Sequence, residues 1–139
     1  MLVCLPALDG ANQVAEIVFQ RISERFSEAD LTVISFHGSE TPVQDFKLRV
    51  IQVTPDDLNP FGLPKKTLKR TILDVEPDVS VDLSETFNPL SAYICMISGA
   101  RIKIGFAMQN SDLVFNYQVA PRPERTGLDR YRVLAQYIG

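Results

Sequence analysis

The chain has 139 residues, of which 45% are apolar, and its formal net charge is −3. Such a chain is typical of one globular domain, and a domain of this size buries roughly two-thirds of its unfolded surface. The net charge gives no electrostatic footprint for nucleic acid or an anionic membrane, and no apolar run approaches the ~18 residues of a membrane span. The two cysteines, Cys4 and Cys95, are expected to be small buried side chains, not a disulfide, and no Cys/His spacing suits zinc.

The first part of the chain reads as strand, helix, strand. Residues 2–5 form a short apolar strand, and residues 6–11 form a turn. From Asn12 to Phe26, apolar residues recur at three- and four-residue spacing, which predicts an amphipathic helix. Residues 31–36 are almost continuously apolar, as a strand covered on both faces should be. The chain therefore opens with a βαβ unit.

The middle of the chain adds one strand and one helix. Residues 37–39 are a loop, residues 41–45 have a Thr-Pro start suited to a short helix, and residues 47–53 are a third strand. Residues 54–63 hold two prolines and a glycine, so we expect irregular structure there. Residues 64–75 are predicted to be a helix with a basic face made by Lys65, Lys66, Lys69 and Arg70.

Residues 79–106 predict a second βαβ unit. A strand at residues 79–83 is followed by Asn88-Pro89, a helix start in which Asn caps free N–H groups and Pro is tolerated. Gly99 is expected to end that helix, and residues 100–106 form the next strand. The apolar face of the helix is expected to consist of Tyr93, Ile94, Met96 and Ile97.

The last part of the chain has a loop at residues 108–112, a strand at 113–119 and a closing helix at 128–138. Asn116 inside the strand indicates an edge position or a strand end. Strands and helices that alternate along the whole chain predict an α/β fold of three layers, a Rossmann-like domain with a mainly parallel sheet. Ligands in such sheets bind beyond the carboxyl ends of the strands, so the candidate residues are those in the loops that follow each strand.

Four passages, in order, resemble the N-terminal domain of the family 9 glycosyltransferases, which include the ADP-heptose:lipopolysaccharide heptosyltransferases. They are LVCLP at residues 2–6, RFSEADLTV at 25–33, PDVSVDL at 77–83 and SGARIKIGF at 98–106. The resemblance covers almost the whole chain. It implies that residues 1–139 are the acceptor-side half of a two-domain architecture, and that the donor-binding C-terminal domain is absent from this chain.

The resemblance also implies a catalytic base in the first turn, where the family carries Gly-Asp. Here the order is Asp9-Gly10 followed by Ala11. Alignment on Gly10 puts Ala11 at the base position, whereas alignment on Asp9 keeps a carboxylate but shifts it. Asp9 is thus a candidate general base, because a carboxylate in this turn would face the cleft. The alternative is that Asp9-Gly10 only suits a tight turn.

Other polar residues in these loops are candidates for binding substrate. His37 is the only histidine and follows a predicted strand, so a plain loop residue is the favoured interpretation. Ser84, Glu85 and Asn88 follow the strand that ends near Asp82, and they could either line a cleft or serve as turn and cap residues. With Gly10, these are the predicted substrate-binding residues.

Two groups of basic residues are interpreted mainly as surface. The basic face at residues 65–70 is a solvated helix surface, or, as the resemblance implies, a contact for an anionic lipopolysaccharide core. Arg122, Arg125, Arg130 and Arg132 are interpreted as a linker surface.

Two functions are compatible with these residues. The first is the acceptor-side domain of a heptosyltransferase-like enzyme in lipopolysaccharide or other cell-surface glycan synthesis, inactive alone, cytoplasmic and peripheral at the bacterial inner membrane. Its partner would be a glycan or glycolipid acceptor, with nucleotide-sugar bound only through a second domain, and with no nucleic acid, metal or cofactor. The second is a non-catalytic α/β module that has lost the chemistry.

Overall fold

The computed structural model describes residues 1–6, 11–26, 30–36 and 48–138. Its described strands form one six-stranded sheet in the order β3-β2-β1-β4-β5-β6, and every neighbouring pair is parallel. The strands are β1 (Leu2–Cys4), β2 (Leu31–Phe36), β3 (Leu48–Val53), β4 (Val79–Asp82), β5 (Ile102–Phe106) and β6 (Tyr117–Val119). The α-helices are α1 (Ala11–Arg25), α2 (Lys66–Leu73), α3 (Pro89–Ile97) and α4 (Leu128–Ile138). Among the described residues, no helix is long and apolar enough to cross a lipid bilayer.

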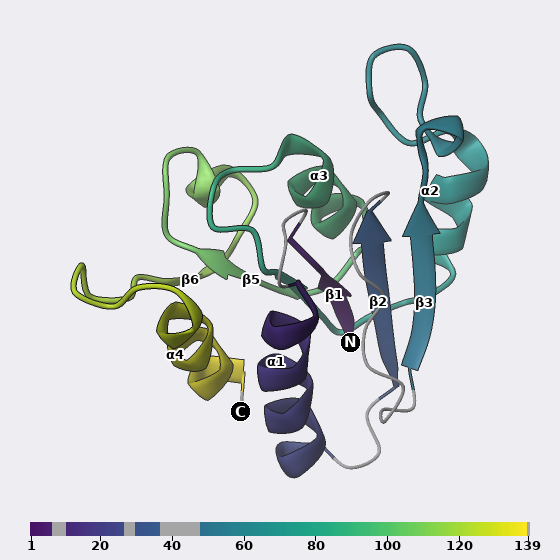
Figure 1. Cartoon of the computed structure of the whole chain (residues 1–139). Helices are drawn as coiled ribbons and strands as arrows, with labels where there is room; N and C mark the ends of the chain where they lie inside the picture. Colours follow the sequence, from purple (N-terminus) through teal and green to yellow (C-terminus); the bar gives the residue numbers. More distant parts are fainter. Residues whose placement is uncertain (7–10, 27–29, 37–47, 139) are drawn as a thin grey trace.

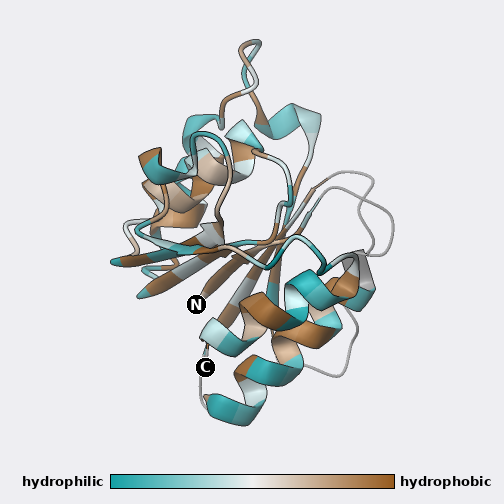
Figure 2. Ribbon diagram, turned by 90° about the vertical axis from the view of Figure 1, so that its left-hand side faces the viewer, coloured by the Kyte–Doolittle hydropathy of each residue, from teal (hydrophilic) through white to brown (hydrophobic). Residues whose placement is uncertain are grey.

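The helices cover the sheet on both faces, which makes the predicted three layers (Figure 1). α1 and α4 pack on one face, where Val18 and Leu134 meet Val81 in one apolar cluster. α2 and α3 pack on the other face, where Ile72 and Ile94 join a second cluster. Figure 2 shows the apolar strands running between these two helical layers. The prediction of a Rossmann-like α/β domain is confirmed.

Both predicted βαβ units are present. β1 and β2 pair in parallel on either side of the α1 connection, and β4 and β5 do the same around α3. The buried run predicted at residues 31–36 is β2, in which all six residues are buried. β2, β1, β4 and β5 form the middle of the sheet, so its centre is built from the two units.

α3 begins and ends as predicted, but the side that it buries differs. Asn88 caps it, and Gly99 follows it with a φ of 76°, a left-handed conformation that glycine adopts at little cost. The predicted apolar face was wrong at Met96, which is 47% exposed, whereas Cys95 is fully buried. The helix packs on β1 and β4 through the side that carries Ser91, Ala92, Ile94 and Cys95.

The last predicted strand is shorter than expected. The segment at residues 113–116 is not a strand: Ser111–Leu113 is a 3-10 helix (η2), and β6 begins only at Tyr117. The side chain of Asn116 accepts a hydrogen bond from the Lys103 N–H at 2.8 Å and donates one to the Arg101 carbonyl at 2.7 Å. A side chain thus makes the bonds to β5 that a longer strand would make with its backbone. The predicted edge position of this strand is confirmed.

Two close packing contacts explain why a glycine stands at position 105 and why both cysteines are buried. A Cβ built on Gly105 would lie 2.6 Å from the ring of Phe115, so glycine in the passage at residues 98–106 has a packing reason. The Sγ atoms of Cys4 and Cys95 lie 3.8 Å apart as free buried thiols, which confirms the prediction for both cysteines. The hydrogen bond to Cys95, with burial, raises the pKa of the Cys4 thiol well above its ordinary value.

Candidate functional site

The strand order defines one place where the loops of the sheet diverge. From β1 the chain moves outward through β2 to β3, and from β4 it moves outward in the opposite direction through β5 to β6. β1 and β4 are neighbours, with Cys4 beside Asp82 in the register. In parallel α/β sheets, this switch in strand order opens a crevice at the carboxyl ends, where ligands bind. The segments after Cys4 and after Asp82 therefore both leave the sheet at this position.

The predicted site residues divide into two groups. Asp9, Gly10 and His37 lie outside the described residues. Ser84, Glu85 and Asn88 lie in the segment between β4 and α3, as predicted. Their side chains differ in their access to solvent: Ser84 is buried, whereas Glu85 is only half-buried.

Asp82, Ser84 and Ser91 form a closed hydrogen-bonded network at the end of β4. One carboxylate oxygen of Asp82 accepts from the Ser84 backbone N–H at 3.0 Å, and the other accepts from the Ser91 hydroxyl at 2.7 Å. The Ser84 and Ser91 hydroxyls lie 3.3 Å apart. All three residues are buried, so this network fixes the start of α3 against β4 and offers little to a ligand. The prediction that Ser84 binds substrate thus gains no support here.

The carboxyl group of Asp82 is destabilised as an anion. Burial raises its pKa above the ordinary value, and the hydrogen bonds from Ser84 and Ser91 oppose this effect. Because the folded-state pKa exceeds the unfolded one, the folded chain binds the proton more tightly. The contribution of Asp82 to stability is therefore present at low pH and is lost as the pH rises through the folded-state pKa.

We expect Asp82→Asn to remove this pH dependence. The Asn oxygen can still accept from the Ser84 N–H, its amide can donate to the Ser91 hydroxyl, and that hydroxyl can donate to the Asn88 carbonyl 3.2 Å away. Relative to the wild type, the variant should become more stable as the pH rises from about 4 to about 8, by on the order of 1 kcal/mol. Urea unfolding across this range measures the difference, and parallel curves for both proteins would contradict the expectation.

Asn88 acts as a helix cap. Its side-chain oxygen accepts hydrogen bonds from the backbone N–H groups of Leu90 at 3.0 Å and Ser91 at 3.3 Å. This is the structural alternative that the sequence left open. The Asn88 oxygen is consequently occupied by α3 itself.

Glu85 is held at the edge of the site by α4. Its carboxylate lies 3.6 Å from Nε of Arg130, and both side chains are about one-third exposed, 36% and 30%. The Arg130 guanidinium also lies 5.4 Å from the centre of the Phe106 ring, at the end of β5. The interpretation of Arg130 as linker surface was wrong, because α4 returns it to the carboxyl edge of the sheet. Arg122 and Arg125 are exposed in the connector, and Arg132 pairs with Asp129 at 2.6 Å.

Two buried donors beside Glu85 make no standard hydrogen bond among the described residues, although both interact with the Glu85 carboxylate. They are Nε of Arg130 and the hydroxyl of Tyr131. The Tyr131 ring packs edge-on against Phe106 at 5.5 Å, and burial, followed by the charge of Glu85, raises the pKa of its phenol. The phenol therefore stays protonated and can donate. Glu85, Arg130 and Tyr131 therefore form one polar group at this edge, in which the carboxylate faces both the guanidinium and the phenol.

Sequence reasoning missed Arg130 and Tyr131 as site residues. Tyr131 was predicted only to pack, from its place on the apolar side of the closing helix, and it is indeed 3% exposed. The sequence signal that could have identified Tyr131 is its hydroxyl, a polar group on the otherwise apolar side of the closing helix. In the described ranges, no three His, Cys, Asp or Glu side chains gather closely enough to hold a metal ion.

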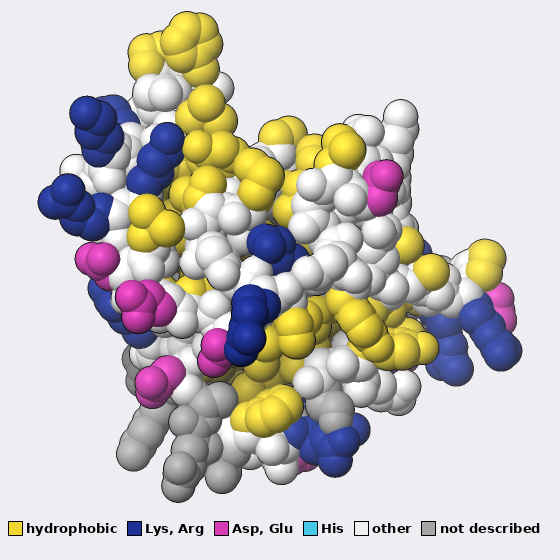
Figure 3. All heavy atoms as spheres, turned by 180° about the vertical axis from the view of Figure 1, so that it is seen from behind, with side chains coloured by type: hydrophobic (Ala, Val, Ile, Leu, Met, Phe, Trp, Pro, Cys, Tyr) yellow, Lys and Arg dark blue, Asp and Glu magenta, His cyan; other side chains and the backbone are white. Residues whose placement is uncertain are grey.

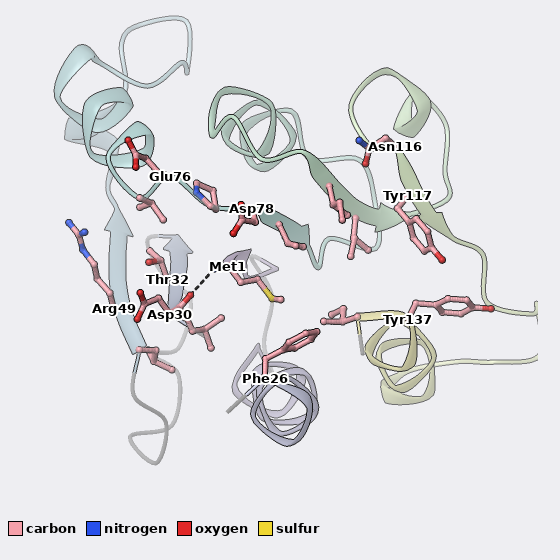
Figure 4. Close-up of a pocket in the computed structure, with 18 of the residues that line it drawn as sticks. Met1, Phe26, Asp30, Thr32, Arg49, Glu76, Asp78, Asn116, Tyr117 and Tyr137 are labelled. Atoms are coloured by element: carbon pink, nitrogen blue, oxygen red, sulfur yellow. Dashed lines mark hydrogen bonds between the residues drawn. The ribbon is translucent and has the colours of Figure 1, made fainter. Parts of the chain in front are cut away.

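A hollow lies at the opposite edge of the sheet, at the amino ends of the strands (Figure 4). It has a volume of about 1460 Å³. Phe26 and Tyr137 reach it from the two helices of one face, and the residues before β4 reach it from the other side. Its charged lining residues are Asp30, Arg49, Asp74, Glu76 and Asp78. This amino-edge cleft holds none of the site residues predicted from the sequence.

Comparison with known proteins assigns no family to this chain. A scan against protein-family models gives no match. A search of curated proteins finds no similar sequence. The fold therefore defines a structural class for this chain, a six-stranded, all-parallel α/β domain of Rossmann-like character.

Proposed function

We propose that this chain is the acceptor-side domain of a glycosyltransferase similar to the ADP-heptose:lipopolysaccharide heptosyltransferases. The supporting observation is where the four resembling passages lie in the fold. They contain β1, β4, β5 and the first half of β2, and these are four neighbouring strands that enclose the switch in strand order. Three of the passages thus reach the carboxyl edge beside this switch, as shared function at that crevice would require, while the passage at residues 25–33 enters β2 from the opposite edge.

The proposed chemistry needs a base, an acceptor hydroxyl and a donor sugar. Asp9, in the segment after β1, would take the proton from the acceptor hydroxyl, whose oxygen then attacks the anomeric carbon while the nucleotide departs. The reaction inverts configuration at that carbon and requires no metal. Glu85, Arg130 and Tyr131 would bind other acceptor groups, because they supply one carboxylate and two donors that make no standard hydrogen bonds at the same edge.

The proposal includes partners and location. The acceptor is a glycan or glycolipid used in lipopolysaccharide or other cell-surface glycan synthesis, and the nucleotide-sugar is bound mainly by a second domain. Nucleic acid is not a partner in this proposal, and no cofactor takes part. The protein would work in the bacterial cytoplasm, peripherally at the inner membrane.

One observation favours a second candidate function, a non-catalytic binding module. The polar atoms of Asp82 and the capping oxygen of Asn88 are occupied by hydrogen bonds within the domain. The Asp9-Gly10 order also departs from the Gly-Asp of the enzymes that the chain resembles. A module that keeps the fold but has lost the base would show both features.

Mapping an acceptor on the chain tests where ligands bind. We expect a lipopolysaccharide core oligosaccharide, titrated into ¹⁵N-labelled protein, to shift the backbone amide signals of Ser84, Glu85 and Arg130. Signals of Asp78 and Tyr117, which line the amino-edge cleft, should stay in place and serve as the internal control. Shifts confined to Asp78 and Tyr117 would move the binding site to the other edge and contradict the proposal.

A further inference from the structure

The segment between β3 and α2 projects from the domain as a rigid loop. The Asn59 side-chain oxygen accepts hydrogen bonds from the N–H groups of Phe61 at 2.9 Å and Leu63 at 3.1 Å. The Asn59 N–H donates to the Leu63 carbonyl at 2.8 Å, and Leu58 and Pro64 close the base as an antiparallel bridge. The backbone of the loop is thus held by its own hydrogen bonds.

This rigid loop presents apolar side chains to solvent. Phe61 at its tip is 88% exposed, and Leu63 is 41% exposed. Figure 3 shows apolar side chains, in yellow, at the tip of the projection, with Lys and Arg side chains, in dark blue, beside it. Folding gains nothing from an aromatic ring held in water. Phe61 and Leu63 together form an exposed apolar pair on one projection, a kind of surface that often marks a contact with a partner or a membrane.

A basic surface lies directly behind the tip. Lys65 caps α2, and Lys66, Lys69 and Arg70 follow at spacing that places them on one side of the helix. At 1.5 Å per residue, Lys65 to Arg70 span about 7.5 Å along the helix axis, close to the Debye length at physiological salt. Lys65 and Lys66 lie at the amino end of α2, where cations oppose the helix dipole, so helix stability does not explain these two.

Two carboxylates lie near the base of the loop, and they do not cancel the basic surface. Asp57 accepts hydrogen bonds from the backbone and hydroxyl of Thr54, at 2.8 and 3.0 Å, so it is committed to the local fold. Asp56 is exposed. Lys69 lies 5.7 Å from the centre of the Tyr93 ring, and the exposed Asp74 and Glu76 follow the far end of α2. The positive charge is therefore concentrated at the loop end of the helix, although the whole chain has a net charge of −3. The overall charge therefore conceals a local basic surface.

We propose that this projection docks the domain on the surface of an anionic lipid bilayer, with Phe61 and Leu63 inserted and the α2 cations at the headgroups. An apolar tip followed by a basic face is the arrangement that binds such interfaces. A protein partner is disfavoured, because only Phe61 and Leu63 supply exposed large apolar side chains on this loop, whereas a stable protein interface buries ~800 Å² per side. This inference names a surface for the peripheral membrane location in the proposed function, but the loop and α2 carry it without the proposed sugar transfer.

A tryptophan placed at the tip reports insertion directly, since the chain contains no tryptophan. Phe61→Trp should show a blue-shifted emission with vesicles of three parts phosphatidylcholine to one part phosphatidylglycerol, and no shift with phosphatidylcholine alone. Leu113→Trp is the matched control, because Leu113 is also highly exposed, at 74%, but lies in η2. Its emission should not change with either vesicle. A Phe61→Trp spectrum unchanged by the anionic vesicles would overturn the proposal.

Vesicle co-sedimentation of the full chain then measures how much the α2 cations contribute to vesicle binding. Each Lys or Arg near an anionic surface contributes about a fivefold gain in binding, so Lys66→Gln with Arg70→Gln should weaken binding about 25-fold. Arg122→Gln with Arg125→Gln removes the same charge from the connector and should leave binding unchanged. Equal losses for both pairs would contradict the proposal. The proposal would also be contradicted if the chain did not bind the vesicles but bound heparin through Lys66 and Arg70. That result would assign the basic surface to an acidic macromolecule.

Discussion

The chain by itself should transfer no sugar and should bind nucleotide-sugars weakly or not at all. In the glycosyltransferases to which the proposed function assigns this chain, the donor rests on a second domain and the reaction takes place between the two. Holding two reactants in register supplies ~7–11 kcal/mol of a bimolecular barrier, so half of a cleft loses most of the catalysis. The sequence has neither a Gly-x-Gly-x-x-Gly passage nor a Walker lysine that would bind the nucleotide within this domain.

Calorimetric titration of the chain with ADP-sugars and UDP-sugars measures this expectation. The same sample should show slow hydrogen exchange for the backbone amides of β2 and β4, which are central in the sheet, so that absent binding is not mistaken for absent folding. Micromolar binding of either nucleotide-sugar by the folded chain would place a donor site in this domain. Transfer to any acceptor would likewise show that the chain is not half of an enzyme.

Much of the fold could be predicted because the signals are local. β2 and α4 have the predicted bounds, Leu31–Phe36 and Leu128–Ile138, since a continuous apolar run and helical spacing each depend on neighbouring residues. The cap at Asn88 is equally local. Predictions were wrong where a distant contact decides the outcome. Met96 is exposed because the packing of α3 on β1 and β4 selects another side, and β6 is short because Asn116 bonds to β5.

The candidate site was less predictable than the fold. Ser84, Glu85 and Asn88 were placed correctly in the segment after β4, because the rule for parallel sheets needs only the position of strand ends. Which of them is available to a ligand depends on partners elsewhere: Asp82 and Ser91 enclose Ser84, and Arg130 holds Glu85. Arg130 lies far along the sequence and approaches Glu85 only because α4 returns to the edge of the sheet. No local pattern carries that information.

Loss of the proposed base should have the second large effect. In a protein that joins this domain to a donor-binding domain, Asp9→Ala should lower turnover by roughly 10²-fold or more, the usual scale for a lost general base. The reason is that the acceptor hydroxyl would then have no group to take its proton as its oxygen attacks. Binding of the nucleotide-sugar, which rests on the other domain, should not change.

The matched control is a carboxylate at the opposite edge of the sheet. Asp78 precedes β4, is exposed and lines the amino-edge cleft, so Asp78→Ala removes the same chemical group away from the proposed crevice. Its turnover should equal that of the wild type. Thermal unfolding of both variants shows whether either change acts through stability, because neither is expected to lower the midpoint by more than a few degrees.

The turnover of Asp9→Ala relative to Asp78→Ala, in the two-domain protein with saturating donor and acceptor, tests most directly whether the carboxyl edge carries the chemistry. The proposed site predicts a loss of about 10²-fold or more for Asp9→Ala and none for Asp78→Ala. Equal turnover of the two variants and the wild type would contradict it and leave Asp9 as a turn residue.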